Sequence, residues 1–541
     1  MSTDEAISGK HATRLSLWRT RPGTFQQTIA GILVTGAGLL AATQSPLAVW
    51  PCALWTGAVA AGGPFDQAAA PASQEPDRSR TEPEPGAHLT ACHAATIGVD
   101  ARCGWVDVPE NRDRHDGRRL RLRIVVLSTE TLAARASDPL FVLAGGPGQA
   151  ASEQAWVLKD FALVRRNRDV VLVDVRGTGD SVPLRCKLPG TDEDPQGYFT
   201  DLYSPASISA CRQELEATAD LTRFTTTETA RDLDAVRAAL GIERMNLFGT
   251  SYGTRLALEY LRRFPRRVRT MTLDAVVSPD MRAPQTFAID GQRALDMLFK
   301  ACGADDQCNT AFPDLRTQFD RMRVRLVAGP VSTVVRVRED APAREVRLGW
   351  DVAAETVRGL LYNANSAARL PLMIHRAAAG DYQPLAEARL AARRGADRAL
   401  ALGLFLSVTC AEDESPLDAA SRERLTRGTF LGAYRMQQQS EACRLWARGS
   451  APTDFHDIVE SDIPALLLSG DLDPVTPPFR SAVQVRALRH SVRGVAPGGA
   501  HAFRWSGCAD LAIARLIETA STEGLDVSCL ARIARPAFVL R

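Results

Sequence analysis

Apolar and polar residues alternate along the chain in a way that predicts strands and helices in turn from about residue 100 to residue 280. After GWVDVPEN and a turn, residues 119–128, RLRLRIVVLS, alternate arginine with apolar residues, the period of a half-exposed strand. The next apolar runs, PLFVLAGG and DVVLVDVRG, are unbroken, as expected of strands covered on both faces of a largely parallel sheet. A helix over 227–240, a strand over 245–248, a helix from Tyr252 and a strand in VRTMTLDAVV continue the alternation.

The pattern changes in the middle of the chain. Residues 283–457 show mainly helical periodicity, with strand signal only in VSTVVRVRE and near EVRLGW. Strand and helix alternate again from DIPALLLSG and close with CADLAIARLIETA. We therefore predict one α/β domain with a mostly parallel sheet flanked by helices, built from residues 90–282 and 458–541 and interrupted by a mainly helical insertion, 283–457.

The N-terminal segment, residues 1–61, has the pattern of a signal peptide or a membrane-targeting segment. Arg14, Arg19 and Arg21 precede the apolar stretch 28–42, and residues 58–60, Ala-Val-Ala, fit a small-residue cleavage site. An uncleaved membrane anchor and a buried helix are the alternatives. Residues 62–89 are rich in Ala, Pro, Glu, Gln and Ser and are predicted to be a flexible linker. We expect an exported protein, periplasmic or secreted, with membrane attachment only through this segment if it stays uncleaved.

Cysteine usage agrees with export. Without Cys52, which lies in the targeting segment, ten of the eleven cysteines remain. They fall into neighbours along the sequence: Cys92 with Cys103, Cys186 with Cys211, Cys302 with Cys308, Cys410 with Cys443, and Cys508 with Cys529. The spacing does not prove connectivity, and free buried thiols are the alternative. A zinc site is not predicted because no C-x-x-C pair occurs, so disulfides in an oxidising compartment are favoured.

Composition and charge indicate a folded globular protein and give no sign of a highly charged partner. The chain has 541 residues, 45% hydrophobic and 24% charged, as in folded globular proteins. Its net charge of +2 is spread along the sequence, so neither nucleic acid nor an acidic surface is indicated as a partner.

One short stretch carries candidate chemistry, NLFGTSYGTRLALEYL. Ser251 lies between Gly249 and Gly253, after an apolar strand and before an amphipathic helix. The same spacing is found where a nucleophilic serine sits in a strained strand-to-helix turn, because side chains at the two glycine positions would clash. A plain tight turn is the alternative, so the remaining parts of a catalytic site must come from elsewhere.

Two late loops supply them in the order that such a serine requires. LLLSGDLDPVTPP places Asp471 and Asp473 after an apolar strand, and GVAPGGAHAF places His501 after the next strand. His501 would take the proton of the Ser251 hydroxyl, and an aspartate would orient the imidazole. The two aspartates compete for that role at this point.

Backbone donors for a developing oxyanion are also predicted. The first is the N–H of Tyr252, directly after the serine, and the second is the N–H of Gly146 in the loop AGGPGQ after an early strand. No metal cluster and no nucleotide-binding loop occur in the sequence, so we expect no cofactor.

Five motifs together resemble a known family. AGGPGQ, DVRGTGDS, GTSYGT, LDPVTPP and GGAHAF are similar to the secreted branch of the proline iminopeptidase and tripeptidyl aminopeptidase family of serine peptidases, from about Cys92 to about Phe538. The resemblance implies the α/β-hydrolase fold, with a helical cap and a C-terminal region like that of the tripeptidyl aminopeptidases. It also implies Ser251, Asp473 and His501 as the triad, and hydrolysis of peptide bonds near a free N-terminus. Proline-specific relatives often carry His where Ala144 stands, so strict proline specificity is not expected.

The resemblance also suggests where the substrate amine is bound. Acidic residues of the cap bind the α-ammonium in aminopeptidases of this type, and SVTCAEDESP offers Glu412 and Asp413. We predict Glu412 as an ammonium ligand, the alternative being a solvated loop carboxylate.

Other functions stay open at this point. An esterase or amidase acting on a non-peptide substrate would use the same triad, and a surface binding protein that keeps the fold is the non-enzyme alternative. An epoxide hydrolase is disfavoured because those enzymes carry an aspartate where Ser251 stands. Residue preference, the number of residues released and oligomeric state are not specified by the sequence.

Overall fold

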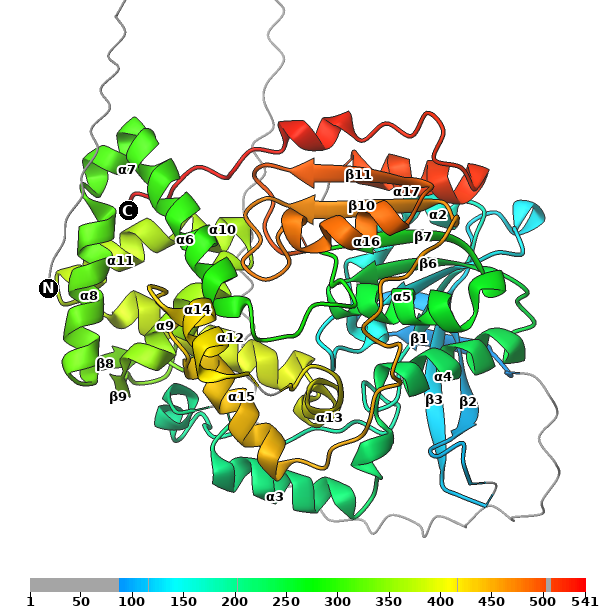
Figure 1. Cartoon of the computed structure of the whole chain (residues 1–541), viewed down its shortest axis with the longest axis horizontal. Coiled ribbons are helices and arrows are strands. Elements are labelled where there is room, and N and C mark those ends of the chain that lie inside the picture. The colour runs from blue at the N-terminus through cyan, green and yellow to red at the C-terminus, as the bar shows by residue number, and fades with distance from the viewer. Residues whose placement is uncertain (1–86, 115, 202, 416, 503–506) are drawn as a thin grey trace, which may run out of the picture. The chain divides into compact units, whose positions relative to one another are not determined.

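The computed structural model describes residues 87–541 except 115, 202, 416 and 503–506. The predicted targeting segment and nearly all of the predicted linker, 62–89, therefore lie outside the described residues. In the described part nine strands form one sheet, with helices on both of its faces (Figure 1). No helix in that part has the length and apolar character that crossing a membrane requires.

The sheet is antiparallel at one edge and parallel through the rest. Its order is β1-β2-β3-β5-β4-β6-β7-β10-β11, and the strands from β5 to β11 in this order run parallel to one another. The predicted hairpin is confirmed as β2 and β3, whereas β1 was not predicted. The bounds are β1 Thr90–Ala94, β2 Val99–Pro109, β3 Arg119–Leu127, β4 Leu140–Leu143, β5 Val170–Val173, β6 Met245–Thr250, β7 Val268–Asp274, β10 Ala465–Gly470 and β11 Ser491–Ala496.

The unbroken apolar runs are confirmed as strands buried on both faces. In β4, Phe141 and Leu143 pack into the hydrophobic cluster on one face of the sheet, and Leu140 and Val142 pack into the cluster on the other face. Successive side chains of a strand point to opposite faces, so a doubly covered strand has no position left for a polar residue. The helices α4 (Thr226–Ala239) and α5 (Tyr252–Arg263) contribute to the first cluster, and α17 (Ala509–Thr519) contributes to the second.

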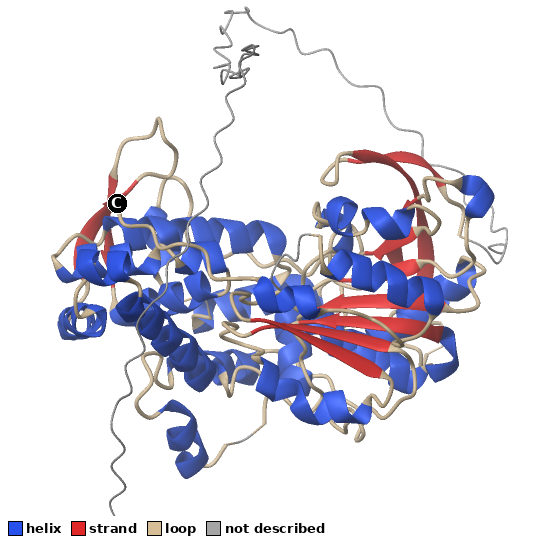
Figure 2. Cartoon of the chain, turned by 90° about the horizontal axis from the view of Figure 1, so that it is seen from above, coloured by secondary structure: helices blue, strands red, loops and turns tan. Residues whose placement is uncertain are grey.

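Helices dominate the segment between β7 and β10 and gather beside the sheet (Figure 2). A separate hydrophobic cluster, which includes Leu298, Phe319 and Leu361, holds most of them together. The bounds are α1 Val157–Asp160, α2 Ala162–Arg165, α3 Pro205–Glu216, α4 Thr226–Ala239, α5 Tyr252–Arg263, α6 Phe287–Ala304, α7 Asp306–Ala311, α8 Leu315–Ala328, β8 Val331–Val335, β9 Arg344–Leu348, α9 Trp350–Leu361, α10 Ala364–Ala367, α11 Leu370–Ala378, α12 Gln383–Ala399, α13 Leu402–Glu412, α14 Ala419–Thr426, α15 Tyr434–Leu445, α16 Ala482–Ala487 and α17 Ala509–Thr519.

Two segments pack across the domain boundaries that were predicted at residues 283 and 457. Helix α13 is apolar around most of its circumference, and its residues Leu402, Leu406 and Cys410 pack into a cluster of the sheet. At the other end of the chain, Phe538 and Leu540 pack against the cluster of the helical segment (Figure 1). The described residues form one compact unit, so the domain boundaries stay a prediction.

The five predicted cysteine pairs are disulfides in the structure: Cys92–Cys103, Cys186–Cys211, Cys302–Cys308, Cys410–Cys443 and Cys508–Cys529. Cys410–Cys443 links α13, which packs on the sheet, to α15 of the helical segment. Cys52 lies outside the described residues.

Candidate active site

Ser251 occupies a strained turn between β6 and α5. Its backbone has φ 54° and ψ −122°, a conformation that residues other than glycine rarely adopt. A Cβ atom on Gly253 would lie 2.1 Å from the carbonyl oxygen of Leu143, and one on Gly249 would lie 2.4 Å from the carbonyl oxygen of Gly253. Both glycines are therefore required for the strand and the helix to approach this closely.

The structure brings His501 and Asp473 to this turn. Nε2 of His501 lies 2.9 Å from Oγ of Ser251, and Nδ1 of the same ring lies 2.8 Å from Oδ2 of Asp473. The aspartate follows β10 and the histidine follows β11, and the carboxyl ends of these parallel strands share one edge of the sheet. The three predicted side chains thus form a continuous hydrogen-bonded row.

Asp473 is held as a carboxylate although it is fully buried. Its Oδ1 accepts from the N–H groups of Val475 and Thr476, and its Oδ2 accepts from the Thr476 hydroxyl at 2.7 Å. Burial raises the pKa of Asp473, but the interaction with His501 and these donors outweigh it, so the pKa lies below its ordinary value. A carboxylate that stays ionised beside an imidazole is suited to stabilising the protonated ring.

The neighbouring aspartate has a different place. Asp471 is 41% exposed, and its Oδ1 and its carbonyl oxygen accept from Arg293 of α6, both at 2.8 Å. It therefore ties the loop after β10 to the helical segment, and Asp473 is the aspartate that contacts His501.

Two residues that sequence reasoning did not single out also hold the imidazole. The Thr476 hydroxyl lies 3.2 Å from Nδ1 of His501, and the signal for it was present in the run Pro-Val-Thr-Pro-Pro. Tyr362, directly after α9, accepts the backbone N–H of His501 at 3.1 Å, and its ring lies edge-on to the imidazole at 5.0 Å. No local sequence signal points to Tyr362, because its contact with His501 depends on how the helical segment packs.

Gly146 and Tyr252, the residues predicted to supply the oxyanion donors, both belong to segments next to Ser251. A Cβ atom on Gly145 would be 3.3 Å from Cβ of Ser251, so the loop after β4 passes directly beside the serine. Gly146 continues this loop with φ 113° and lines the cavity at Ser251. The N–H of Tyr252 belongs to the first turn of α5, where backbone donors have no partner within the helix. The Tyr252 hydroxyl contacts the Thr226 hydroxyl at 2.8 Å in the protein interior.

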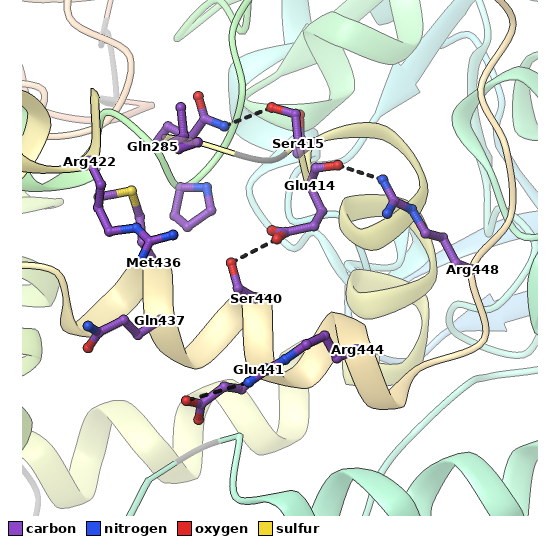
Figure 3. A pocket seen from close by; sticks show the side chains of 13 residues that line it. Gln285, Glu414, Ser415, Arg422, Met436, Gln437, Ser440, Glu441, Arg444 and Arg448 are labelled. Carbon is purple, nitrogen blue, oxygen red and sulfur yellow. Dashed lines mark hydrogen bonds and ion pairs between the residues drawn. The ribbon is translucent and has the colours of Figure 1, made fainter. Parts of the chain in front are cut away.

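A cavity of about 370 Å³ opens over these residues. Its sheet side includes Gly145, Gly146, Ser251 and His501, and its other side is formed from the helical segment, with lining residues Phe287, Arg358, Tyr362, Leu400, Phe405 and Arg435. A second cavity, of about 490 Å³, lies against α15 and is also lined by residues 413–415 and 417 (Figure 3). Ser440 and Arg448 donate to Glu414 there, and neither Ser251 nor His501 lines it.

The structure does not bring Glu412 to the cavity beside Ser251. Its side chain is only 4% exposed, and its two oxygens accept from the N–H and the hydroxyl of Thr226 at 2.6 and 2.7 Å. The predicted role as an ammonium ligand therefore needs correction, because this carboxylate faces the start of α4 inside the protein. Its neighbour Asp413 is paired with Arg255 at 2.6 Å.

Burial of Glu412 makes stability depend on pH. Burial raises the pKa of this carboxyl to about 8, against the bonds from Thr226 and the charge of Arg255. The folded chain thus keeps a proton that the unfolded chain loses above about pH 4.5, so this group lowers stability as pH rises towards 8. We expect Glu412→Gln to match the wild type at pH 4.5 and to exceed its free energy of unfolding by about 2–4 kcal/mol at pH 8.5.

Urea unfolding at the two pH values measures this difference. Glu441→Gln, which removes a carboxylate that is 44% exposed, is the control and should give the same difference from wild type at both pH values. A stability gain for Glu412→Gln that does not change with pH would contradict the argument.

The sheet order and the flanking helices are those of the α/β-hydrolase fold, and Ser251 lies in the turn between β6 and α5. Residues 138–300 match the family described as alpha/beta hydrolase fold, and residues 428–529 match the family described as TAP-like protein. The predicted fold is thus confirmed, and the resemblance to the aminopeptidase family agrees with these matches.

Relatives with a similar sequence are named as peptidases. The chain is 32% identical over 221 residues to the tripeptidyl aminopeptidase of Streptomyces lividans, covering 36% of this chain and 41% of that protein. It is 31% identical over 193 residues to the serine protease Hip1 of Mycobacterium tuberculosis, covering 33% of this chain and 36% of that protein. The aligned regions therefore span about two fifths of these relatives or less.

Matches among solved structures include a proline iminopeptidase and an esterase. A proline iminopeptidase of Mycobacterium smegmatis is 16% identical, with a TM-score of 0.34, and the match covers 77% of this chain and 98% of that one. An esterase of Thermogutta terrifontis is 15% identical, with a TM-score of 0.35, and the match covers 77% and 99% of the two chains.

Proposed function

We propose that this protein is an exported serine exopeptidase that hydrolyses peptide bonds near a free N-terminus, as an aminopeptidase or a tripeptidyl aminopeptidase. The observation that carries the proposal is the placement of the His501 ring between the Ser251 hydroxyl and the Asp473 carboxylate. A hydroxyl with a base on one side and a buried acid behind that base is the arrangement that acyl transfer requires.

The residues would act in the following order. Oγ of Ser251 attacks the scissile carbonyl carbon while Nε2 of His501 accepts the hydroxyl proton, and Asp473 stabilises the imidazolium. The N–H groups of Tyr252 and Gly146 donate to the oxyanion of the tetrahedral intermediate. His501 then gives its proton to the leaving amine. In the second half of the reaction water attacks the acyl-enzyme while His501 accepts a proton from it, and His501 returns that proton to Oγ of Ser251 as the serine leaves.

The substrate class follows from the relatives and from the cavity. The relatives named tripeptidyl aminopeptidase, serine protease and proline iminopeptidase act on peptides by name. A cavity of about 370 Å³, closed on one side by the helical segment, suits a short piece of peptide better than a folded protein. Ala144 replaces the histidine that proline-specific relatives often carry, so we expect no strict preference for proline.

Export is supported by the five disulfides, because such bonds persist in oxidising compartments. The N-terminal segment 1–61 would serve as the targeting signal.

Chromogenic amides test the function directly. We expect hydrolysis of aminoacyl or tripeptidyl nitroanilides with a free amine, and at least tenfold lower kcat/KM for the same compounds with an acetylated N-terminus, because the blocked substrate has lost its ammonium group. Turnover of short-chain esters without turnover of any amide would instead identify an esterase or amidase acting on non-peptide substrates.

A further inference from the structure

The helical side of the cavity over Ser251 carries two guanidinium groups, those of Arg358 from α9 and Arg435 from α15. We propose that Arg435 binds a carboxylate of the substrate, so that the enzyme prefers peptides with an acidic group close to the scissile bond. This inference rests on the proposed peptidase function and adds a substrate class to it.

Each of the three side-chain nitrogens of Arg358 already donates a hydrogen bond within the protein. Its Nη1 donates to the Tyr362 hydroxyl at 2.7 Å, and its Nε and Nη2 donate to Oε2 of Glu355 at 3.1 and 2.9 Å. Tyr362 in turn accepts the backbone N–H of His501. Arg358 therefore orients the tyrosine that packs against the imidazole and contributes its charge to the cavity from a fixed position.

Arg435 differs because it forms no ion pair among the described residues, and Glu355, which interacts with its charge, is already paired with Arg358. Among the described residues, no carboxylate lies within salt-bridge distance of Arg435, and its Nε is buried without a hydrogen-bond partner. The guanidinium instead lies over the ring of Tyr203 at 4.8 Å and near that of Phe405 at 5.9 Å. Aromatic rings hold an arginine in place without neutralising it, so the group remains available for an anion.

The charges around this position favour a carboxylate over an ammonium group. Burial raises the pKa of Glu355, but Arg358, Arg435 and Arg389 outweigh it, and the pKa lies below its ordinary value. One carboxylate, which is 14% exposed, thus interacts with the charges of three guanidinium groups. Asp351 is solvent-exposed, and Asp274, at the end of β7 on the sheet side of the cavity, is buried and within 3.5 Å of the Thr250 hydroxyl.

An ion pair with Arg435 would form in a partly desolvated place, where charge-assisted hydrogen bonds are strong. Two parts of a substrate can supply the carboxylate: an acidic side chain in the released peptide, or the free C-terminus of a short peptide. Both are the same chemistry for a guanidinium group, and substrates of defined sequence distinguish them.

Kinetics with matched substrates tests the first source. Nitroanilides of Ala-Ala-Glu and Ala-Ala-Gln differ only in that the third side chain ends in a carboxylate or in a carboxamide. We expect kcat/KM to be about 10- to 100-fold higher for the glutamate compound. Arg435→Gln should bring this ratio to about one, and Arg435→Lys should keep part of it. Arg444→Gln is the matched control on the same helix, because Arg444 is 75% exposed and does not line this cavity, and its ratio should equal that of the wild type.

Binding to the Ser251→Ala variant tests the proposal without turnover. Calorimetry with Ala-Ala-Ala as free acid and as C-terminal amide reports on the second source, and Ala-Ala-Glu amide against Ala-Ala-Gln amide reports on the first. A preference of at least tenfold in either pair, lost in the Ser251→Ala, Arg435→Gln double variant, supports the carboxylate site. Equal binding within both pairs overturns it, whatever the stability of the Arg435 variants. Absence of amide hydrolysis by the wild type would refute the peptidase function. The binding measurements would still decide whether Arg435 forms a carboxylate site.

Discussion

Replacement of Ser251 by alanine is expected to lower kcat by about 10⁴- to 10⁶-fold while leaving the fold intact. The substitution removes the one oxygen atom that lies 2.9 Å from Nε2 of His501, and it keeps a Cβ in a turn that already accommodates one at φ 54°. Activity on a free-amine nitroanilide and labelling by a fluorophosphonate measure the effect, since the reagent reacts with an activated serine hydroxyl.

Ser440→Ala is the control for this experiment. Ser440 lies on α15 in the second cavity, where its hydroxyl donates to Glu414 at 2.8 Å (Figure 3). Its variant should label and turn over substrate at the wild-type rate. Fluorophosphonate labelling that persists in Ser251→Ala would mean that another group is the nucleophile.

Replacement of Asp473 by asparagine is expected to lower kcat by about 10³- to 10⁴-fold. The amide carries no charge to stabilise the imidazolium, and its NH₂ group opposes the tautomer in which Nδ1 of His501 donates to the aspartate. Because Oδ1 also accepts the N–H groups of Val475 and Thr476, thermal unfolding must be measured beside kcat. The assay belongs at a temperature well below the midpoint of the variant.

Asp471→Asn is the matched control for Asp473→Asn. Asp471→Asn removes a carboxylate from the same loop, but that carboxylate contacts Arg293 and not the imidazole. We expect its kcat to remain within about threefold of the wild type. An equal loss in both variants would show that the loop as a whole, and not the contact of Asp473 with His501, determines the rate.

The sequence predicted the sheet and the serine turn because the physics of both is local. A doubly buried strand must be apolar throughout, as β4 and β5 are, and the approach of β6 to α5 permits only glycine at positions 249 and 253. The order of Ser251, Asp473 and His501 followed from the order of strands in such a sheet.

The helical side of the site could not be predicted in the same way. Arg358 reaches the cavity from α9, Tyr362 from the turn after α9, and Arg435 from α15. Their positions therefore depend on how helices far apart in sequence pack together. Glu412 was misplaced for a related reason. An acidic pair in the inserted segment suggested a carboxylate that faces the substrate, but α13 is buried on most sides and carries its last carboxylate into the interior.

The C-terminal tail has a mechanical consequence for substrate entry. The N–H of Val539 donates to the carbonyl of Ala368, and Phe538 and Leu540 cover apolar side chains of the helical segment. The C-terminal tail thus adds to the contacts that join the helices to the rest of the chain, which already include the packing of Tyr198 and Phe199 into the helical cluster. Any movement of the helices away from the sheet would have to break these contacts of the tail first, so removal of residues 538–541 is expected to make such a movement easier.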